Sequence, residues 1–188
     1  TLGGYGISRF RFRGRNALSY IILTTQVLPG SLLIIPLYII MGNMQLLDTR
    51  MGLVMAYATF SVPFCTWMMY GYFKSISTGL DEAARVDGSS AFNTFLKIIL
   101  PIALPGLVAT IIYAFLQNWN EYMFASVLMS ADEKKTITYA ISTMADAYKI
   151  QWNYLMCAAM ISSVPTLTVF VVMQKYLIAG MTAGAVKE

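Results

Sequence analysis

Long apolar runs without charge alternate along the chain with short charged segments. There are four such runs: Ala17–Met41, Gly52–Phe73, Ile98–Asn120 (resuming after Glu121 as far as Met129) and Asn153–Gln174. About 20 apolar residues, rising 1.5 Å each in a helix, cross the hydrocarbon core. Each run is predicted to be helical, because lipid offers backbone groups no water to bond. The pattern therefore predicts an all-α membrane protein, a single domain over 1–188 with spans near 17–41, 52–73, 98–129 and 153–175.

The charged segments between the runs predict an orientation. Arg9, Arg11, Arg13 and Arg15 alternate just before the first run, and segment 74–97 also carries basic residues. Placing these segments and the C-terminus in the cytoplasm puts nine Lys and Arg inside and four outside. Cytoplasmic loops carry this basic excess. Segments 42–50 and 130–151 are then predicted to lie on the outer side, and a nucleic-acid partner is not expected.

The chain starts at Thr1, without an initiator methionine or a signal-peptide pattern. Residues 1–10 resemble the end of an earlier helix. We therefore expect an N-terminally incomplete helical bundle, with four full spans and the end of a preceding one.

Composition supports a lipid environment and argues against catalysis. Hydrophobic residues make up 57% of the chain and charged ones 12%, about half the share typical of soluble domains. There is no histidine, so the usual general base and the commonest metal ligand are both missing. The cysteines, Cys65 and Cys157, lie in apolar runs and are interpreted as small buried hydrophobes. We expect a chain that is not an enzyme and holds no cofactor or metal.

Segment 74–97 carries the most specific pattern. Thr78 is placed to cap a helix, with Asp81 three residues later as its acidic partner. Gly88 is expected to end that helix, and Ser89 or Ser90 to cap a second one that leads toward the membrane. The segment is thus predicted to form two short helices that project into the cytoplasm.

These two helices are suited to docking on another protein. Ala83 and Ala84 leave one face small, Val86 and Phe92 supply apolar contacts, and Glu82 can pair with basic groups on a partner. An amphipathic helix lying on lipid is the alternative. Such a helix is usually rich in Lys and Arg on its polar face, whereas this one is led by acidic residues.

The same segment resembles a known family motif. Glu82-Ala83-Ala84, three residues, Gly88, nine residues, Ile98, one residue and Leu100-Pro101 match the EAA motif of permease subunits in binding-protein-dependent ABC importers. The carbohydrate branch, typified by the maltose permease subunit MalG, is similar over nearly the whole chain. Further similar segments are Arg85-Val86-Asp87-Gly88, Pro105, residues 9–15, Trp119-Asn120-Glu121-Tyr122 and residues 180–187.

The resemblance implies a type I ABC importer permease fold in the prokaryotic inner membrane. It implies a second, different permease subunit, a dimeric cytoplasmic ATPase and an extracytoplasmic solute-binding protein as partners. ATP and Mg would belong to the ATPase, and the chain itself has no Gly-rich phosphate loop. The implied ATPase-docking residues are Glu82, Ala83, Ala84, Arg85, Asp87, Gly88 and Phe92.

Glu121 is the acidic residue embedded in an apolar run. An ionisable group at membrane depth is a candidate functional residue, and Asn118, Trp119 and Asn120 beside it could meet a sugar. These four residues are the predicted substrate pathway. The alternative is that Glu121 is hydrated or paired near the outer interface and only fixes helix packing.

Other functional classes fit less well. An ion-coupled secondary transporter, the main alternative, usually carries paired intramembrane charges or inverted repeats, and neither is visible. A membrane-embedded enzyme would need a catalytic constellation that Glu121 does not supply. The six prolines lie in or beside the runs and can be tolerated kinks or bends that line a pathway.

Overall fold

The computed structural model describes the backbone of residues 1–145 and 151–185 and the side chains of residues 1–145 and 151–175. Within these ranges the chain is helical and contains no β-strand, as the sequence predicts. Lys149, one of the four basic residues predicted on the outer side, and residues 180–187 of the family resemblance lie outside the described side chains. The helices are α1 (Leu2–Arg9), α2 (Arg15–Val27), α3 (Gly30–Asn43), α4 (Arg50–Ser75), α5 (Gly79–Val86), α6 (Ala91–Thr94), a π-helical segment (Phe95–Ile99), α7 (Leu100–Ile102), α8 (Leu104–Trp119), α9 (Met123–Leu128), a 3₁₀ turn (Asp132–Lys134), α10 (Ile137–Thr143) and α11 (Trp152–Ala185).

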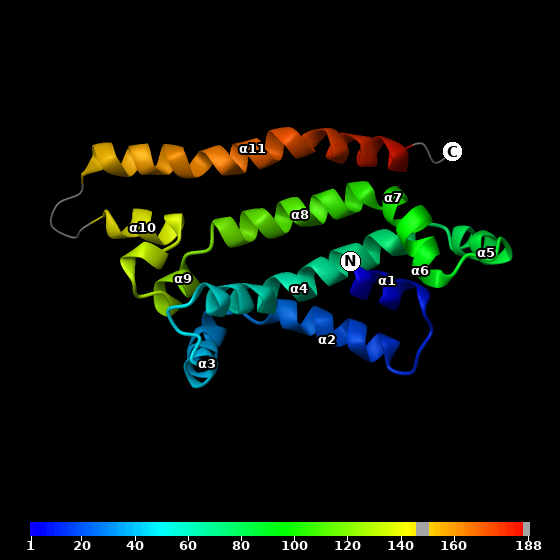
Figure 1. The fold of residues 1–188 in the computed structure, drawn as a ribbon, viewed down its shortest axis with the longest axis horizontal. Helices are drawn as coiled ribbons and strands as arrows, with labels where there is room; N and C mark the ends of the chain where they lie inside the picture. The colour runs from blue at the N-terminus through cyan, green and yellow to red at the C-terminus, as the bar shows by residue number, and fades with distance from the viewer. Residues whose placement is uncertain (146–150, 186–188) are drawn as a thin grey trace.

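Helix α4 is the centre of the bundle. α1, α2 and α8 pack against it, and α11 packs on the far side of α8 (Figure 1). The turn after α1, helix α5 and the C-terminal end of α11 lie at one end of the bundle, whereas α3, α9 and α10 lie at the other. The segments predicted to be cytoplasmic therefore lie together at one end, and those predicted to be outer lie at the other. The two ends are called the cytoplasmic end and the outer end below after that prediction. The orientation itself stays a prediction.

Two of the predicted spans are single helices and two are bent. Arg50–Ser75 and residues 152–175 of α11 are each long and apolar enough to cross a membrane. Helices α2 and α3 meet at 101°, and the helical stretch 91–102 meets α8 at 77°. At the first bend, Leu28 and Pro29 are both extended, and α3 starts directly after them. The proline ring disfavours helical backbone in the residue before it. That each bent pair crosses the membrane once stays a prediction.

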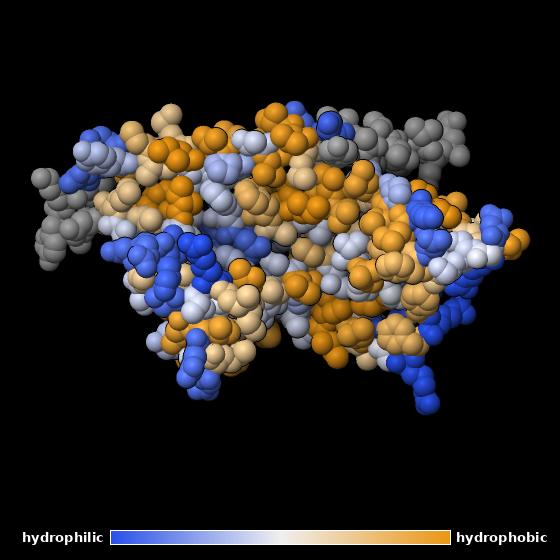
Figure 2. All heavy atoms as spheres, in the orientation of Figure 1, coloured by the Kyte–Doolittle hydropathy of each residue, from blue (hydrophilic) through white to orange (hydrophobic). Residues whose placement is uncertain are grey.

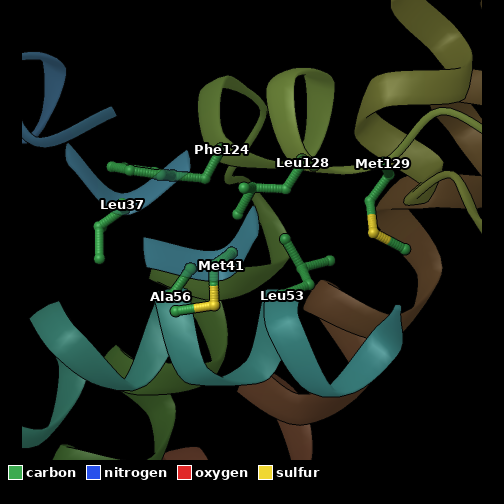
Figure 3. Packing of buried hydrophobic residues seen from close by; sticks show 8 residues of the cluster. Leu37, Met41, Leu53, Ala56, Phe124, Leu128 and Met129 are labelled. Carbon is green, nitrogen blue, oxygen red and sulfur yellow. The ribbon is translucent and has the colours of Figure 1, made fainter. Parts of the chain in front are cut away.

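Two apolar clusters hold the two ends of the bundle. At the outer end, residues of α3, α4 and the α9 region pack together (Figure 3): Leu37, Met41, Leu53, Ala56, Phe124, Ala125, Leu128 and Met129. At the cytoplasmic end, Tyr5 of α1 and Phe73 of α4 meet Phe95 and Ile99 of the π-helical segment. The clusters leave the middle of α4 free to line a cavity.

Close helix contacts depend on small residues, as is usual where lipid replaces the hydrophobic driving force. A Cβ at Gly4 would meet the backbone of Tyr70, and one at Gly106 would overlap the ring of Tyr72. On the surface, apolar side chains cover the middle of the visible face, and the most hydrophilic ones gather toward its two ends (Figure 2). Such a band between polar ends fits a bundle that spans lipid.

Candidate functional site

Helix α5 projects from the cytoplasmic end of the bundle (Figure 1). Glu82, Ala83, Arg85, Asp87 and Gly88 are exposed, as are two large apolar side chains, Val86 at 88% and Phe92 at 65%. These residues, called the docking surface below, contain all the predicted docking residues except Ala84. Ala84 is buried at 3% exposure and therefore faces the chain's own interior.

Local sequence explains how α5 ends and α6 begins. The amide of Gly88 donates to the carbonyl of Arg85, and the amide of Ser89 donates to that of Ala84. This pattern closes a helix with a left-handed residue, and Gly88 has a φ of 77°, where glycine avoids the steric cost of a Cβ. Ser90 Oγ then accepts from the Asn93 amide and caps α6. Both signals work as predicted.

The predicted capping pair at the start of α5 is wrong. Thr78 occupies the cap position but makes no side-chain capping hydrogen bond. Asp81 is instead drawn toward α1, where Tyr5 Oη donates to its Oδ1 at 2.7 Å. Arg9 Nε lies 3.0 Å from its Oδ2. Asp81 therefore pairs with α1 rather than with the start of its own helix, because a tyrosine hydroxyl and an arginine are strong partners for a carboxylate in a buried site.

A cavity of about 240 Å³ opens in the outer half of the bundle. α4 lines one side with Tyr57, Ser61 and Phe64, and α8 lines the facing side with Tyr113 and Gln117. The remaining lining residues are Gln26, Gly30, Phe60, Asn118, Glu121 and Phe124. No lysine or arginine is among these residues, so the cavity offers aromatic faces and neutral polar groups together with one carboxylate.

The cavity's polar groups are held in fixed positions. Ser61 Oγ donates to Asn118 Oδ1 at 3.1 Å, which joins α4 to α8. Gln117 Nε2 donates to Tyr113 Oη at 2.7 Å. The rings of Phe64 and Tyr113 stack with centroids 4.0 Å apart and planes 21° apart. Apolar walls with a few oriented polar groups are typical of small-molecule sites.

Glu121 has a structural partner of its own. Its Oε1 accepts from the Phe124 amide at 2.7 Å, and its Oε2 accepts from the Ala125 amide at 3.1 Å. These are the free amides of the first turn of α9, where a carboxylate is favoured. Glu121 therefore holds the start of α9, as the packing interpretation expects, and it also lines the cavity. A contact between Glu121 and a solute stays a prediction.

The four predicted pathway residues do not lie together. Asn118 and Glu121 line the cavity. Trp119 instead turns toward α11, where its Nε1 donates to the Ser162 carbonyl at 3.1 Å. Asn120 is exposed and its side chain donates back to the Leu116 carbonyl. Neighbours on a helix point about 100° apart, so adjacent residues cannot share one face.

Sequence reasoning missed most of the cavity. Ser61 lies four residues after Tyr57 and three before Phe64, and Gln117 lies four residues after Tyr113. Residues three or four apart share one face of a helix. A search for polar residues at that spacing inside the apolar runs would have found them. Their approach to each other across α4 and α8 could be seen only in the fold.

A second carboxylate organises the outer loops. Asp48 Oδ1 accepts from the amides of Ser130 and Ala131, at 2.9 and 3.0 Å, and Lys134 Nζ lies 3.0 Å from its Oδ2. The Ala131 amide, then Lys134 and the Ser130 amide, lower the pKa of Asp48 to about 2. Among the described residues, no three His, Cys, Asp or Glu side chains are grouped so as to hold a metal ion.

Comparison with known proteins gives consistent matches. Residues 1–183 match the family described as "Binding-protein-dependent transport system inner membrane component". The chain is 35% identical over 183 residues to "Probable ABC transporter permease protein YurM" of Bacillus subtilis, covering 97% of this chain and 61% of that protein. It is 31% identical over 188 residues to "Trehalose/maltose transport system permease protein MalG" of Thermococcus litoralis, covering 100% and 68%.

The fold also matches a solved structure. That structure is the crystal structure of a bacterial ABC transporter involved in the import of the acidic polysaccharide alginate. The TM-score is 0.77 at 30% sequence identity, and the match covers 93% of this chain and 66% of the other. The chain thus spans less than two thirds of the length of YurM and of the matched transporter chain.

Proposed function

The chain belongs to the family of binding-protein-dependent transport system inner membrane components, and from that premise we propose that it is a permease subunit of an ATP-driven importer for a neutral sugar or oligosaccharide. α5 would dock in a cleft of a dimeric cytoplasmic ATPase. A second, different permease subunit would complete the pathway, and an extracytoplasmic binding protein would deliver the solute. ATP and Mg would bind the ATPase. Membership of this family leaves the ion-coupled secondary transporter without support.

The exposed docking surface is the observation on which this proposal depends. Val86 and Phe92 expose large apolar side chains at the polar end of a membrane protein, where water makes such exposure unfavourable. Helices with apolar contacts and flanking charges commonly dock in a groove on another protein. An ATPase that closes on ATP would carry α5 with it, and the bundle would rock between two states around this contact.

The cavity supports the solute class. Stacked aromatic rings and amide and hydroxyl groups suit the faces and hydroxyls of a sugar. Among its lining residues Glu121 is the ionisable acid, and no lysine or arginine is there to balance an acidic sugar. This differs from the acidic polysaccharide of the matched alginate transporter. A neutral sugar is therefore the better fit.

The test is reconstitution of the complete complex in lipid vesicles. Val86→Ser and Phe92→Ala each remove apolar contacts, so we expect roughly tenfold weaker ATPase binding, the size of a strong interface contact. ATPase stimulation by solute-loaded binding protein should fall with it. In a panel of binding proteins loaded with different sugars, those that carry neutral sugars should stimulate ATP hydrolysis.

Arg13→Gln is the matched control, because Arg13 is exposed at the same end but outside the docking surface. It should bind the ATPase as the unmodified chain does. Full ATPase binding by both docking-surface variants would contradict the docking role, and stimulation by acidic sugars alone would contradict the solute class.

A further inference from the structure

Helix α1 grips the docking helix through a buried cluster, and we propose that Tyr5 and Arg9 are positioning residues that lock α5 to the bundle through Asp81. This inference rests on the proposed docking of α5. It assigns a role in coupling to three residues, called the latch below: Tyr5, Arg9 and Asp81. None of them belongs to the docking surface.

The latch is buried and close. Asp81 is 8% exposed, although it lies on a helix that projects from the bundle. Its two oxygens are held separately, one by Tyr5 Oη at 2.7 Å and the other by Arg9 Nε at 3.0 Å. Tyr5 and Arg9 are one helical turn apart on α1, so both reach the same carboxylate.

Arg9 also grips the segment that leads into α5. Its terminal nitrogen donates to the Ile76 carbonyl at 2.9 Å and lies 3.5 Å from the Ser77 carbonyl. One guanidinium thus binds the last residues before α5 and the carboxylate inside α5. Arginine is suited to this, because its planar group presents several donors in a fixed arrangement.

Tyr5 ties the latch to the cytoplasmic cluster. Its ring lies 5.5 Å from that of Phe73 in α4 and 4.7 Å from that of Phe95 in the π-helical segment. α1 in turn packs along α4. A displacement of α5 is therefore transmitted through Asp81 to α1 and α4 together, rather than being lost in a loose hinge at residues 76–78.

Stability alone does not explain a charged pair at this position. Replacing a buried ion pair by apolar residues is often neutral or stabilising, whereas removal of one partner leaves a buried unpaired charge. A charged pair supplies a fixed geometry, because its attraction acts between specific atoms. Hydrophobic burial, in contrast, depends on the buried apolar area and not on one arrangement of atoms. The latch therefore serves to fix the angle and register of α5 on the bundle.

The experiment is a double-mutant cycle in the reconstituted complex. The variants are Arg9→Gln, Asp81→Asn and the pair, and the readout is solute imported per ATP hydrolysed. We expect each single variant to lower this ratio about three- to tenfold, the size of coupling effects along such networks. The double variant should import at least as much solute per ATP as the single variant with the lower ratio. In the double variant neither charge is left unpaired in the buried site.

Further variants separate positioning from folding. Tyr5→Phe removes one hydroxyl and keeps the ring in its cluster, so it should fold and still lower the ratio. Arg9→Lys keeps the positive charge but loses the planar guanidinium. Its ratio of solute imported per ATP should therefore lie between that of Arg9→Gln and that of the unmodified chain. Spin labels at Ala83→Cys and Arg13→Cys should give a broader distance distribution in Tyr5→Phe than in the unmodified latch.

The control cycle is Arg11→Gln with Lys97→Gln, two exposed charges outside both the latch and the docking surface; its effects should be small and additive. Additive effects in the latch cycle, or an unchanged ratio and distance distribution in Tyr5→Phe, would overturn the latch. If the latch fails in this way but Val86→Ser still weakens ATPase binding, the proposed function is retained and only the latch is wrong. Full binding by the docking-surface variants would instead remove the proposed function itself.

Discussion

At the scale of the residue, side chains of the same type differ in burial and in the groups they contact. Arg9, Arg11 and Arg13 alternate in the sequence, yet Arg9 is buried in an ion pair while Arg11 and Arg13 are exposed. Asp48, Asp81 and the cavity's Glu121 likewise differ in their partners. In each case the partner is a backbone or side-chain group brought close by folding, and it decides what the charge does.

Asp48 gives a prediction about acid stability. Its pKa is about 2 in the folded chain and about 3.9 in an unfolded one. A carboxylate with a lowered folded-state pKa adds stability above the unfolded value and loses it as the pH falls toward the folded value. Asp48→Asn should therefore lower the Tm in detergent at pH 6, and the difference from the unmodified chain should shrink between pH 4 and pH 2.

The companion variant Lys134→Met identifies the cause. The Ala131 and Ser130 amides lower the pKa of Asp48 together with Lys134, so part of the pH dependence should survive this change. A Tm difference for Asp48→Asn that stays constant from pH 6 to pH 2 would mean that the outer-loop contacts do not depend on this charge.

At the scale of the element, helix packing depends on single small residues. Gly106 of α8 is buried, and a Cβ there would overlap the Tyr72 ring of α4. Gly71 lies one residue away from Tyr72 on α4, is exposed, and has open space around it. The two glycines look alike in the sequence, but only the first lies at a helix contact.

Alanine at these glycines should therefore act in opposite directions. Gly106→Ala should destabilise the bundle by roughly 1–3 kcal/mol, the usual cost of overpacking. Gly71→Ala should stabilise it by about 0.5–1 kcal/mol, because alanine favours the helix. Thermal unfolding in detergent measures both, and Tyr72→Ala combined with Gly106→Ala should recover part of the loss. Equal effects of the two alanines would show that α8 does not approach α4 this closely.

At the scale of the whole molecule, the two ends of the bundle differ in chemistry. The cytoplasmic end carries exposed Arg11 and Arg13 together with α5, and the outer end carries the Asp48 contacts and α9 and α10. An apolar band separates them on the visible face. The fold thus predicts which residues a reagent can reach from each side of a membrane.

Cysteine labelling of intact cells tests this orientation. In a background with Cys65 and Cys157 replaced by serine, Glu133→Cys should react with an impermeant maleimide. Arg13→Cys should react only after the membrane is permeabilised, because basic segments are retained in the cytoplasm. Labelling in the reverse order would invert the orientation and place the docking surface outside the cell.

Some elements were predictable because their causes are local. The apolar runs around α4 and α11, the glycine end of α5 and the serine cap of α6 each depend on residues within a few positions. Hydropathy and capping act over one or two helical turns. The EAA spacing likewise lies within one segment, so the family could be recognised from the sequence.

By itself, then, the sequence determined a helical membrane protein, its two chemically different ends and the position of α5, since these follow from local composition. Only the tertiary structure decided that Asp81 turns to Tyr5, 76 residues away, that Trp119 leaves the cavity, and that Ser61 meets Asn118 across two helices. Those pairings depend on which helix faces approach each other and at what angle. That choice is made by packing small residues such as Gly106 against distant partners, and no local pattern records it.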